Sequence, residues 1–480
     1  MSTPIILWFR QDLRLADHPA LNAAVREDRS VIPVYIHDED AAGQWSPGGA
    51  SAWWLHHSLS SLSESIASKG GELCLRRGDT LATLKELCAE TGATEIYCTR
   101  RYEPWAADQE KSLHESLKSE DIVLKRYSGS LLFEPGELLT QGGSPFKVFT
   151  PFWRAAQTKT IAEPLKVPKV DWSNAKNSDE LEDWSLLPQK PNWAEGWEQF
   201  WTPGEAGASE QLQNFVDDAI SDYSDARDIP SRPATSRLSP HLHLGELSPR
   251  QVWHVAEQQR RNPSIPQAAI SKFQAELGWR EFSYHLLHFF PHIPTDSFKE
   301  QFAGFPWVTN SEQLERWQKG QTGYPIVDAG MRELWQTGFM HNRVRMVVAS
   351  FLCKHLRIHW KEGEAWFWDT LVDADLASNG CSWQWVAGSG ADAAPYFRIF
   401  NPVAQGEKFD GEGEYVRRWV PELAKMPNKF IHAPWIAPKE ILTAAGVDLG
   451  TDYPEPLVDH KEARQAALDA YETVKLRAAS

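Results

Sequence analysis

Short runs of β-branched and apolar residues alternate with amphipathic stretches through the first 130 residues. The apolar runs predict five strands: PIILWF, SVIPVYI, GELCLRRG, EIYCTR and IVLKRYSG. The stretches between them have helical periodicity: HPALNAAVRE, ASAWWLHHSLSSLSESIASK, TLATLKELCAET and DQEKSLHESLKS. This alternation predicts βαβ units and a parallel sheet. No GxGxxG follows the first strand, so the usual dinucleotide-binding fingerprint is absent.

A long connector separates this region from the rest of the chain. From about 131 to 210, prolines and tryptophans interrupt any regular period, which predicts irregular structure wrapped on the surface. The remainder favours helices, and Ser248 followed by Pro249 marks one helix start. We therefore expect an α/β domain with a parallel five-stranded Rossmann-like sheet over 1–130, a linker over 131–210 and an all-α domain over 211–480.

Composition is that of an ordinary globular protein, with 42% hydrophobic and 24% charged residues. No apolar run reaches the roughly 18 residues of a membrane helix, and MSTPIILWFR does not have the pattern of a signal peptide. The five cysteines are scattered without a CxxC pair, which indicates neither a disulfide framework nor a zinc site. We expect a cytoplasmic protein without a metal.

Charge and tryptophan content each leave two interpretations open. A net charge of −16 argues against a nonspecific nucleic-acid binder, but screening over about 8–10 Å allows a local basic patch. The chain has 23 Trp against 11 Tyr, which fits either rigid core anchors or functional indoles. Trp383 and Trp385 stand two apart and cannot point the same way on a helix, so one could face inward and the other outward.

The stretch ATSRLSPHLHLGELS contains a candidate phosphate site. Thr235, Ser236 and Ser239 put three hydroxyls just before an expected helix, where backbone N–H groups suit an anion. Simple capping and turn formation explain the same residues. His241 and His243 have no third ligand at metal-binding spacing, which indicates a structural role.

Two helical stretches combine charged and aromatic residues. In AELGWREFSYHLL, Glu276 and Arg280 are at i,i+4, which fits either a surface ion pair or a pocket with a nearby indole. In MHNRVRM, Arg345 could pair with an internal carboxylate while Arg343 reaches a phosphate outside.

Asp373 and Asp375 form a DxD pair. It does not fit a calcium loop, because Ala377 and Ser378 replace a ligand and the turn glycine. The pair also has no obvious nucleophile as a partner for acid–base catalysis. A carboxylate here could pair with Arg345 or accept hydrogen bonds from a ligand.

Together these stretches resemble the DNA photolyase/cryptochrome family. The similar residues occur in family order: WFRQDLRLADHPAL, TSRLSPHLHLGELS, ELGWREF, TGYPIVDAGMREL, MHNRVRM and DADLASNGCSWQWVAGSGADAAPYFRIFNP. The resemblance covers about residues 4–475 and is greatest to bacterial cyclobutane pyrimidine dimer photolyases of class I or class III type. It implies an α/β antenna domain, a long linker and a helical domain that holds FAD.

The resemblance implies roles for individual residues around the flavin. Asp373 and Asp375 would contact the isoalloxazine edge and the adenosine side, Arg345 would pair with Asp373, and Asn379 would face flavin N5. The implied FAD-binding residues are Tyr223, Thr235, Ser236, Arg237, Leu238, Ser239, Arg280, Asn342, Arg345, Asp373, Asp375 and Asn379. The implied electron-transfer chain, from flavin to surface, is Trp383, Trp360 and Trp307.

The resemblance also implies a binding pocket for a pyrimidine dimer. The dimer bases would stack on Trp279 and Trp385 and hydrogen-bond Glu276, which has a catalytic role, and Asn342. Family members that repair (6-4) photoproducts place a histidine near the position of Met346, and this chain has none there. Further implied DNA-contacting residues are Arg227, Arg280, Arg343, Arg398, Gln405 and Lys408.

The implied function is light-driven repair of cyclobutane pyrimidine dimers by electron transfer from excited reduced FAD, in a monomer. The alternative is a cryptochrome blue-light photoreceptor, which shares the fold and FAD. For the antenna pigment, GGASAWWLHHSL resembles the class III subgroup, which binds methenyltetrahydrofolate. Tyr102-Glu103 is followed by Pro104 and lacks the carboxylate of another folate-binding pattern. The alternative interpretation of Trp53 and Trp54 is packing of a helix against the sheet.

Overall fold

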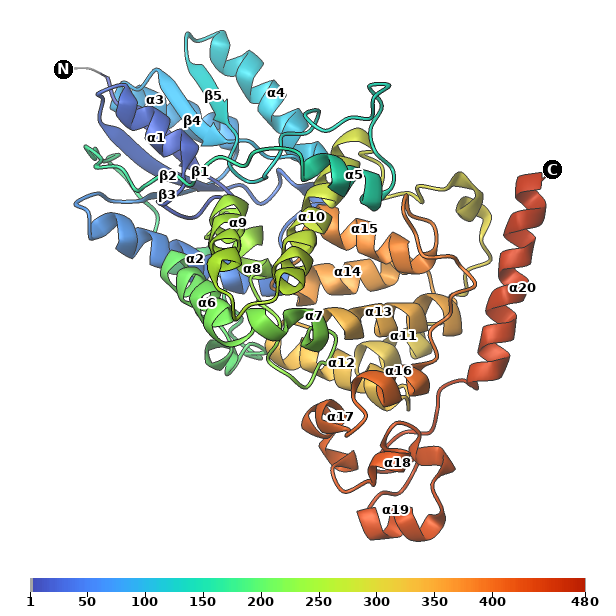
Figure 1. The fold of residues 1–480 in the computed structure, drawn as a ribbon. Helices are drawn as coiled ribbons and strands as arrows, with labels where there is room; N and C mark the ends of the chain where they lie inside the picture. Colours follow the sequence, from blue (N-terminus) through green and yellow to red (C-terminus); the bar gives the residue numbers. More distant parts are fainter. Residues whose placement is uncertain (1–2, 480) are drawn as a thin grey trace. The chain divides into compact units, whose positions relative to one another are not determined.

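The N-terminal region is a parallel sheet flanked by helices (Figure 1), as the alternating pattern predicts. The computed structural model describes residues 3–479, with side chains up to residue 475. The strands are β1 Ile5–Phe9, β2 Val31–His37, β3 Cys74–Arg77, β4 Glu95–Thr99 and β5 Val123–Tyr127. Their order in the five-stranded sheet is β3-β2-β1-β4-β5, and every pair is parallel.

Four helices connect these strands and cover the sheet. They are α1 Pro19–Arg26, α2 Gly49–Ala67, α3 Thr80–Thr91 and α4 Pro104–Lys118. Every residue of β1 is buried, which is typical of a central parallel strand covered on both faces. Leu84 of α3 and Leu113 of α4 join Ile6 and Ile96 in one hydrophobic core. The predicted strands and helices of this region are therefore confirmed.

The rest of the chain is mostly helical, which confirms the predicted fold class. The helices are α5 Phe149–Ala156, α6 Glu205–Asp218, α7 Tyr223–Ala226, α8 Ser239–His243, α9 Pro249–Gln258, α10 Gln267–Phe289, α11 Ser311–Gln318, α12 Pro325–Thr337, α13 Asn342–Ser350, α14 Trp360–Thr370, α15 Leu376–Ala387, α16 Pro402–Phe409, α17 Glu414–Trp419, α18 Asn428–Ile431, α19 Lys439–Ala445 and α20 His460–Ala479. A single π-helical turn, Phe351–His355, continues α13. Among residues 3–479, no helix has the length and apolar character needed to span a membrane.

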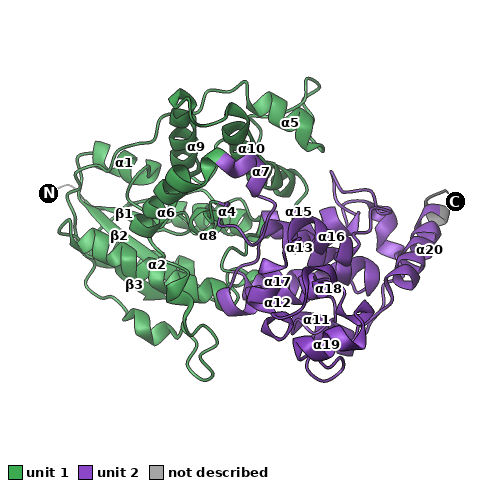
Figure 2. Cartoon of the chain, turned by 60° about the horizontal axis from the view of Figure 1, so that its bottom comes forward, with its two compact units in different colours: residues 1–221, 236–291, 372–377 green, residues 222–235, 292–371, 378–480 purple. Residues whose placement is uncertain are grey.

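The chain forms two compact units (Figure 2). The first contains residues 1–221, 236–291 and 372–377, so it joins the sheet to the connector and to α8, α9 and α10. The second contains residues 222–235, 292–371 and 378–480. The predicted domain boundaries at residues 130 and 210 separate the chain by its secondary structure and do not coincide with these two units. They stay a prediction.

The connector is not simply wrapped on the surface. Its Trp184, Trp197 and Trp201 are 3%, 2% and 6% exposed. Trp197 packs edge-on against Trp53 of α2, with ring centroids 5.3 Å apart. Most other residues of the connector are partly or fully exposed, so these indoles anchor a segment that otherwise lies at the surface. They do so because they are large apolar groups, and burying them stabilises the first unit.

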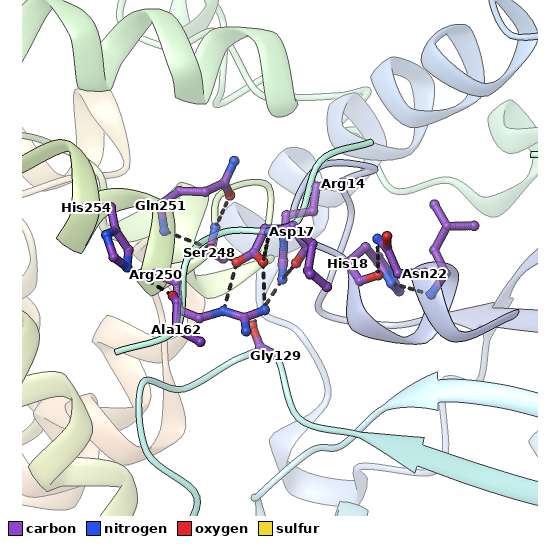
Figure 3. Close-up of polar contacts among 12 residues, drawn as sticks. Arg14, Asp17, His18, Asn22, Gly129, Ala162, Ser248, Arg250, Gln251 and His254 are labelled. Atoms are coloured by element: carbon purple, nitrogen blue, oxygen red, sulfur yellow. Dashed lines mark hydrogen bonds and ion pairs between the residues drawn. The ribbon is translucent and has the colours of Figure 1, made fainter. Parts of the chain in front are cut away.

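A buried carboxylate ties the sheet region to α9 within the first unit (Figure 3). Asp17 is fully buried and pairs with the Arg250 guanidinium at 2.7 Å. Ser248 Oγ donates to Asp17 at 2.5 Å and also accepts from Gln251 N at 3.0 Å. Ser248 is therefore the predicted N-cap of α9, with Pro249 at the first helical position.

Candidate active site

The candidate cofactor residues are distributed over both units. Ser236, Arg237, Leu238, Ser239, Arg280, Asp373 and Asp375 belong to the first unit; Tyr223, Thr235, Asn342, Arg345 and Asn379 belong to the second.

The hydroxyl-rich stretch lies in the loop before α8. Arg237 has a φ of 51°, a left-handed conformation that is uncommon outside glycine and often marks a functional loop. Its guanidinium lies 4.1 Å from the ring centroid of Trp201. Ser239 is the first residue of α8 rather than a residue before it, and Leu238 at the N-cap makes no side-chain capping bond. The left-handed conformation of Arg237, rather than a capping hydroxyl, therefore sets the direction of the backbone before α8.

Asp375 is the centre of a buried polar cluster in the first unit. The Tyr284 hydroxyl of α10 donates to its carboxylate, and His243 Nδ1 lies 3.8 Å from Oδ2. Arg280 stacks over the Tyr284 ring at 4.9 Å and donates to the Ser130 carbonyl at 2.9 Å. His243 therefore lies beside a candidate cofactor residue, and the structural role expected for it stays a prediction.

This environment keeps Asp375 ionised. Burial by itself would raise its pKa, but the proximity of His243, with the charge of Arg280 and the hydrogen bond from Tyr284, holds the pKa of Asp375 well below its usual range. Burial raises the pKa of the Tyr284 phenol far above its usual value, so the phenol stays a donor. His243, Arg280 and Tyr284 also line a small cavity together with Ser130. The partners of Asp375, rather than its carboxylate, therefore border this cavity.

Asn379 of α15 is held by a second buried carboxyl residue. Its Nδ2 donates to the Glu364 backbone carbonyl at 3.2 Å, and Asn379 is 8% exposed. Within the described residues, Glu364 Oε1 is buried without a hydrogen-bond partner. Burial raises the pKa of Glu364 to about 8, so this carboxyl is largely protonated at neutral pH. The residue that orients Asn379 through its backbone thus carries a neutral acid side chain.

These residues fit a flavin. Asn379 Oδ1 accepts no hydrogen bond from another described residue, so the amide keeps an acceptor for a ring N–H. Asp375 supplies a buried acceptor of fixed charge, and the loop at Arg237 supplies hydroxyls and backbone N–H groups. Such a set matches the mixed polar and apolar chemistry of FAD.

The three candidate electron-transfer tryptophans all lie in the second unit. Trp383 and Trp360 are 2% and 0% exposed, and Trp307 is half-buried. A Cβ added at Gly363 of α14 would lie 2.1 Å from the Trp383 ring, so α14 and α15 meet face to face there. His359 contacts both other indoles, with its ring centroid 5.5 Å from that of Trp360 and 4.9 Å from that of Trp307.

The candidate substrate residues are partly exposed. Trp385 is half-buried while Trp383 on the same helix is buried, which confirms that the two indoles face different ways. On α10, the half-buried Glu276 pairs with Lys272 at 3.4 Å. Phe149 stacks on Trp279 at a centroid distance of 3.7 Å, so a base would have to stack on the other face of that indole.

The candidates on α13 have partners inside the second unit. Arg343 pairs with Asp228 at 2.7 Å and stacks over Phe409 at 4.5 Å. Arg345 Nε donates to the Met340 carbonyl at 2.7 Å. Asn342 is exposed at the start of the helix and Met346 is half-buried. The pairing of Arg345 with Asp373 joins the two units and stays a prediction.

The candidate phosphate-binding residues differ in their exposure to solvent and in whether a carboxylate already lies beside them. Arg398 and Lys408 are exposed, and Gln405 is half-buried on the same helix as Lys408. Arg227 is half-buried, 3.8 Å from Asp228, so that carboxylate lies close to both Arg227 and Arg343. Arg398 and Lys408 are therefore the stronger candidates for phosphate contacts.

Sequence reasoning missed Tyr284, Glu364 and His359. Tyr284 follows Arg280 by four residues, so i,i+4 spacing could have placed both on one helix face. Glu364 and His359 carried no such signal, because only the packing of α14 shows what each side chain contacts.

The segment compared with class III antenna proteins is packed in the first unit. Trp54 Nε1 donates to Glu246 at 3.0 Å, and its ring contacts Trp201 and His241 edge-on. Trp53 contacts Trp197. These aromatic partners come from the connector and α8 rather than from the sheet. The Tyr102 hydroxyl donates to Glu134 at 2.5 Å.

Comparison with known proteins gives the same family for both ends of the chain. A family model described as DNA photolyase matches residues 5–169. A second model, described as the FAD binding domain of DNA photolyase, matches residues 273–473 and supports FAD as the cofactor.

Individual relatives match along almost the whole chain. A deoxyribodipyrimidine photo-lyase of Agrobacterium fabrum is 52% identical over 99% of this chain and 98% of its own length. A crystal structure of a bacterial class III photolyase from Agrobacterium tumefaciens has a TM-score of 0.95 and 51% identity, covering 99% of this chain and 98% of that one. Cryptochrome-2 of Arabidopsis thaliana is 38% identical over 97% of this chain and 78% of its own length.

Proposed function

The chain belongs to the DNA photolyase/cryptochrome family, and we propose that it is a photolyase that uses light to repair cyclobutane pyrimidine dimers in DNA. One observation carries this proposal. On α15, Asn379 and Trp383 are buried, while Trp385 is half-buried and available to a ligand. A chain that only exchanged electrons would have no use for an accessible indole beside the buried ones.

FAD, when bound, reduced and excited by light, supplies an electron to the dimer and takes it back after the cyclobutane ring has split. The protein binds and positions both partners. Asp375 keeps its negative charge, and Asn379 presents an amide whose orientation is fixed by Glu364. We propose that these two residues orient the flavin, and that Arg345 supports them by pairing with Asp373.

We propose that Trp385 and Trp279 form the stacking surfaces for an extruded dimer. A damaged pair costs less to extrude than a normal one, which contributes to selectivity. Glu276 and Asn342 then supply hydrogen bonds to the bases. Arg398 and Lys408 contact the backbone phosphates, whose attraction depends strongly on salt.

Trp383, Trp360 and Trp307 are proposed to return the flavin to its reduced state after oxidation. Each indole in turn transfers one electron in the direction of the flavin, and an external thiol reduces the last oxidised indole. The burial of the first two and the partial exposure of the third fit that direction. We further propose methenyltetrahydrofolate as the antenna pigment, on the resemblance of GGASAWWLHHSL to the class III subgroup, and a monomer in the cytoplasm.

Selective binding to damaged DNA tests the photolyase assignment against the cryptochrome alternative. The measurement is the Kd of the FAD-loaded protein, in the dark, for a duplex with one thymine dimer and for the same duplex undamaged. We expect a clear preference for the damaged duplex. Trp385→Ala should weaken it by about 1–3 kcal/mol, roughly 5- to 150-fold, because one base–indole stack is lost.

Trp335→Ala is the matched control, because Trp335 is a 51% exposed indole of α12 that has no part in the proposed pocket. It should leave both affinities unchanged. Equal affinity of the unmodified protein for the two duplexes would favour a photoreceptor. Equal losses in the two tryptophan variants would contradict the role of Trp385.

A further inference from the structure

His359 lies between two of the proposed electron-transfer tryptophans. Its ring centroid is 4.9 Å from that of Trp307 at an interplanar angle of 50°, and 5.5 Å from that of Trp360 at 37°. His359 is also the N-cap of α14, where its Nδ1 accepts from Lys361 N at 3.1 Å. The same residue therefore starts the helix and contacts both indoles.

The imidazole is uncharged at neutral pH. Because Nδ1 accepts a hydrogen bond, the neutral ring carries its proton on Nε2. Burial, and after it the positive charge of Lys361, lower the pKa of His359 to about 4. Among the described residues no carboxylate offsets this shift, and Glu362 on the same helix is exposed and donates its backbone N–H to the His359 carbonyl.

Other charged groups near this segment act elsewhere. The charge of Arg357, two residues before His359, acts on Tyr396, and its carbonyl accepts from Val308 N beside Trp307. Lys354 Nζ donates to the Arg398 carbonyl at 2.9 Å. Lys361 Nζ lies 5.9 Å from the Trp360 ring centroid and is the cation that acts on this pair.

Trp360 is unusually sensitive to a neighbouring charge. It is fully buried, and among the described residues its Nε1 has no hydrogen-bond partner. An oxidised Trp360 therefore has no adjacent acceptor for its N–H proton and keeps its positive charge. A second positive charge in ring contact would disfavour that state strongly, because buried charges are poorly screened.

We propose that His359 is an electrostatic gate between Trp360 and Trp307, open to electron transfer as the neutral imidazole and closed by a positive charge at this position. The inference rests on the proposed electron-transfer chain. In the open state one electron moves from Trp307 to the oxidised Trp360, and an external thiol then reduces Trp307. A positive charge at residue 359 makes both indoles harder to oxidise. The electron gained by the flavin then returns to the oxidised tryptophan before an external thiol can reduce the chain.

The test compares His359→Lys with His359→Met in the FAD-loaded protein at pH 7.5. Both side chains have similar length and neither can accept the capping bond, so they differ mainly in charge. The measurement is the rate of flavin photoreduction under blue light with a thiol. We expect His359→Met to stay within about threefold of the unmodified protein and His359→Lys to be at least about tenfold slower. Equal rates in the two variants would overturn the proposal.

A second measurement keeps the test decisive if His359→Lys does not fold. NMR titration of the histidine rings should show one ring, missing in His359→Met, that is still neutral at pH 5.5. The photoreduction yield of the unmodified protein should begin to fall below that pH, and the fall should be absent in His359→Met. A yield with the same pH profile in both proteins would contradict the gate.

Trp360→Phe separates this inference from the function on which it rests. If that variant photoreduces at the normal rate, the proposed tryptophan chain is wrong and the gate fails with it. If Trp360→Phe blocks photoreduction but the charge at residue 359 has no effect, the gate alone is wrong.

Discussion

At the scale of single residues, Glu276 makes the most direct test of the substrate pocket. It is half-buried on α10, with Lys272 as an ion-pair partner one turn earlier. Glu276→Gln should lower the dimers repaired per absorbed photon by about tenfold, because a charged hydrogen bond to the substrate contributes about 1.5–3 kcal/mol. The FAD content, measured from the flavin absorbance, should not change.

The control for Glu276 is Lys272→Gln. It removes the same ion pair but leaves the carboxylate, and an exposed pair of this kind contributes at most about 1 kcal/mol. Repair should therefore stay near its normal yield. A similar loss of repair in both variants would show that the ion pair, and not the carboxylate, matters.

Residue chemistry was predictable where side-chain spacing defined it. The opposite orientation of Trp383 and Trp385 followed from helix geometry and is confirmed. The protonation of Glu364 and the position of His359 between two indoles were not predictable, because both depend on burial and on neighbours far along the chain. The same limit applies to His243, whose approach to Asp375 could not be predicted from the sequence.

At the scale of elements, the contact between α14 and α15 depends on a glycine. Gly363→Ala should destabilise the protein by about 1–3 kcal/mol, because the new Cβ would overlap the Trp383 ring. This outweighs the roughly 1 kcal/mol by which alanine favours a helix over glycine. Urea unfolding followed by circular dichroism measures the change.

Glu362→Ala is the matched control on the same helix. Glu362 is exposed, so the substitution should change the free energy of unfolding of the protein by less than about 0.5 kcal/mol. If Gly363→Ala proved as stable as that control, the close approach of α14 to Trp383 would be contradicted.

The elements themselves were largely predictable. The five strands and the four helices between them match the apolar pattern, because parallel strands covered on both faces must be almost continuously apolar. The burial of the connector's tryptophans was not predictable from its irregular period. Trp184 and Trp197 are buried by partners that come from distant parts of the chain.

At the scale of the whole molecule, several histidines are buried uncharged in both units. Burial lowers the pKa of His285 and of His341 to about 4, and that of His355 to about 3, from an ordinary value of 6.5. Because these pKa values are lower in the folded state, the unfolded chain binds protons first as the pH falls. The free energy of unfolding should therefore decrease between pH 6.5 and about pH 4, by up to roughly 3 kcal/mol per histidine.

Urea unfolding at pH 7.5, 6.5, 5.5 and 4.5 tests this dependence. His285 Nε2 accepts from Phe146 N at 3.0 Å, and glutamine can replace that acceptor without titrating. His285→Gln should therefore reduce the loss of stability in acid, whereas His114→Gln, at an exposed position of α4, should leave it unchanged. A stability that did not fall between pH 6.5 and 4.5 would contradict the buried neutral histidines.

Light-dependent repair is the most direct test of the proposed function. Purified protein with reduced FAD would be illuminated with blue or near-ultraviolet light in the presence of a thymine-dimer oligonucleotide. The recovery of thymine absorbance would be followed against a sample kept in the dark. We predict recovery in the light and none in the dark. Intact dimers after illumination, in a protein whose flavin still photoreduces, would contradict repair and leave the photoreceptor as the function.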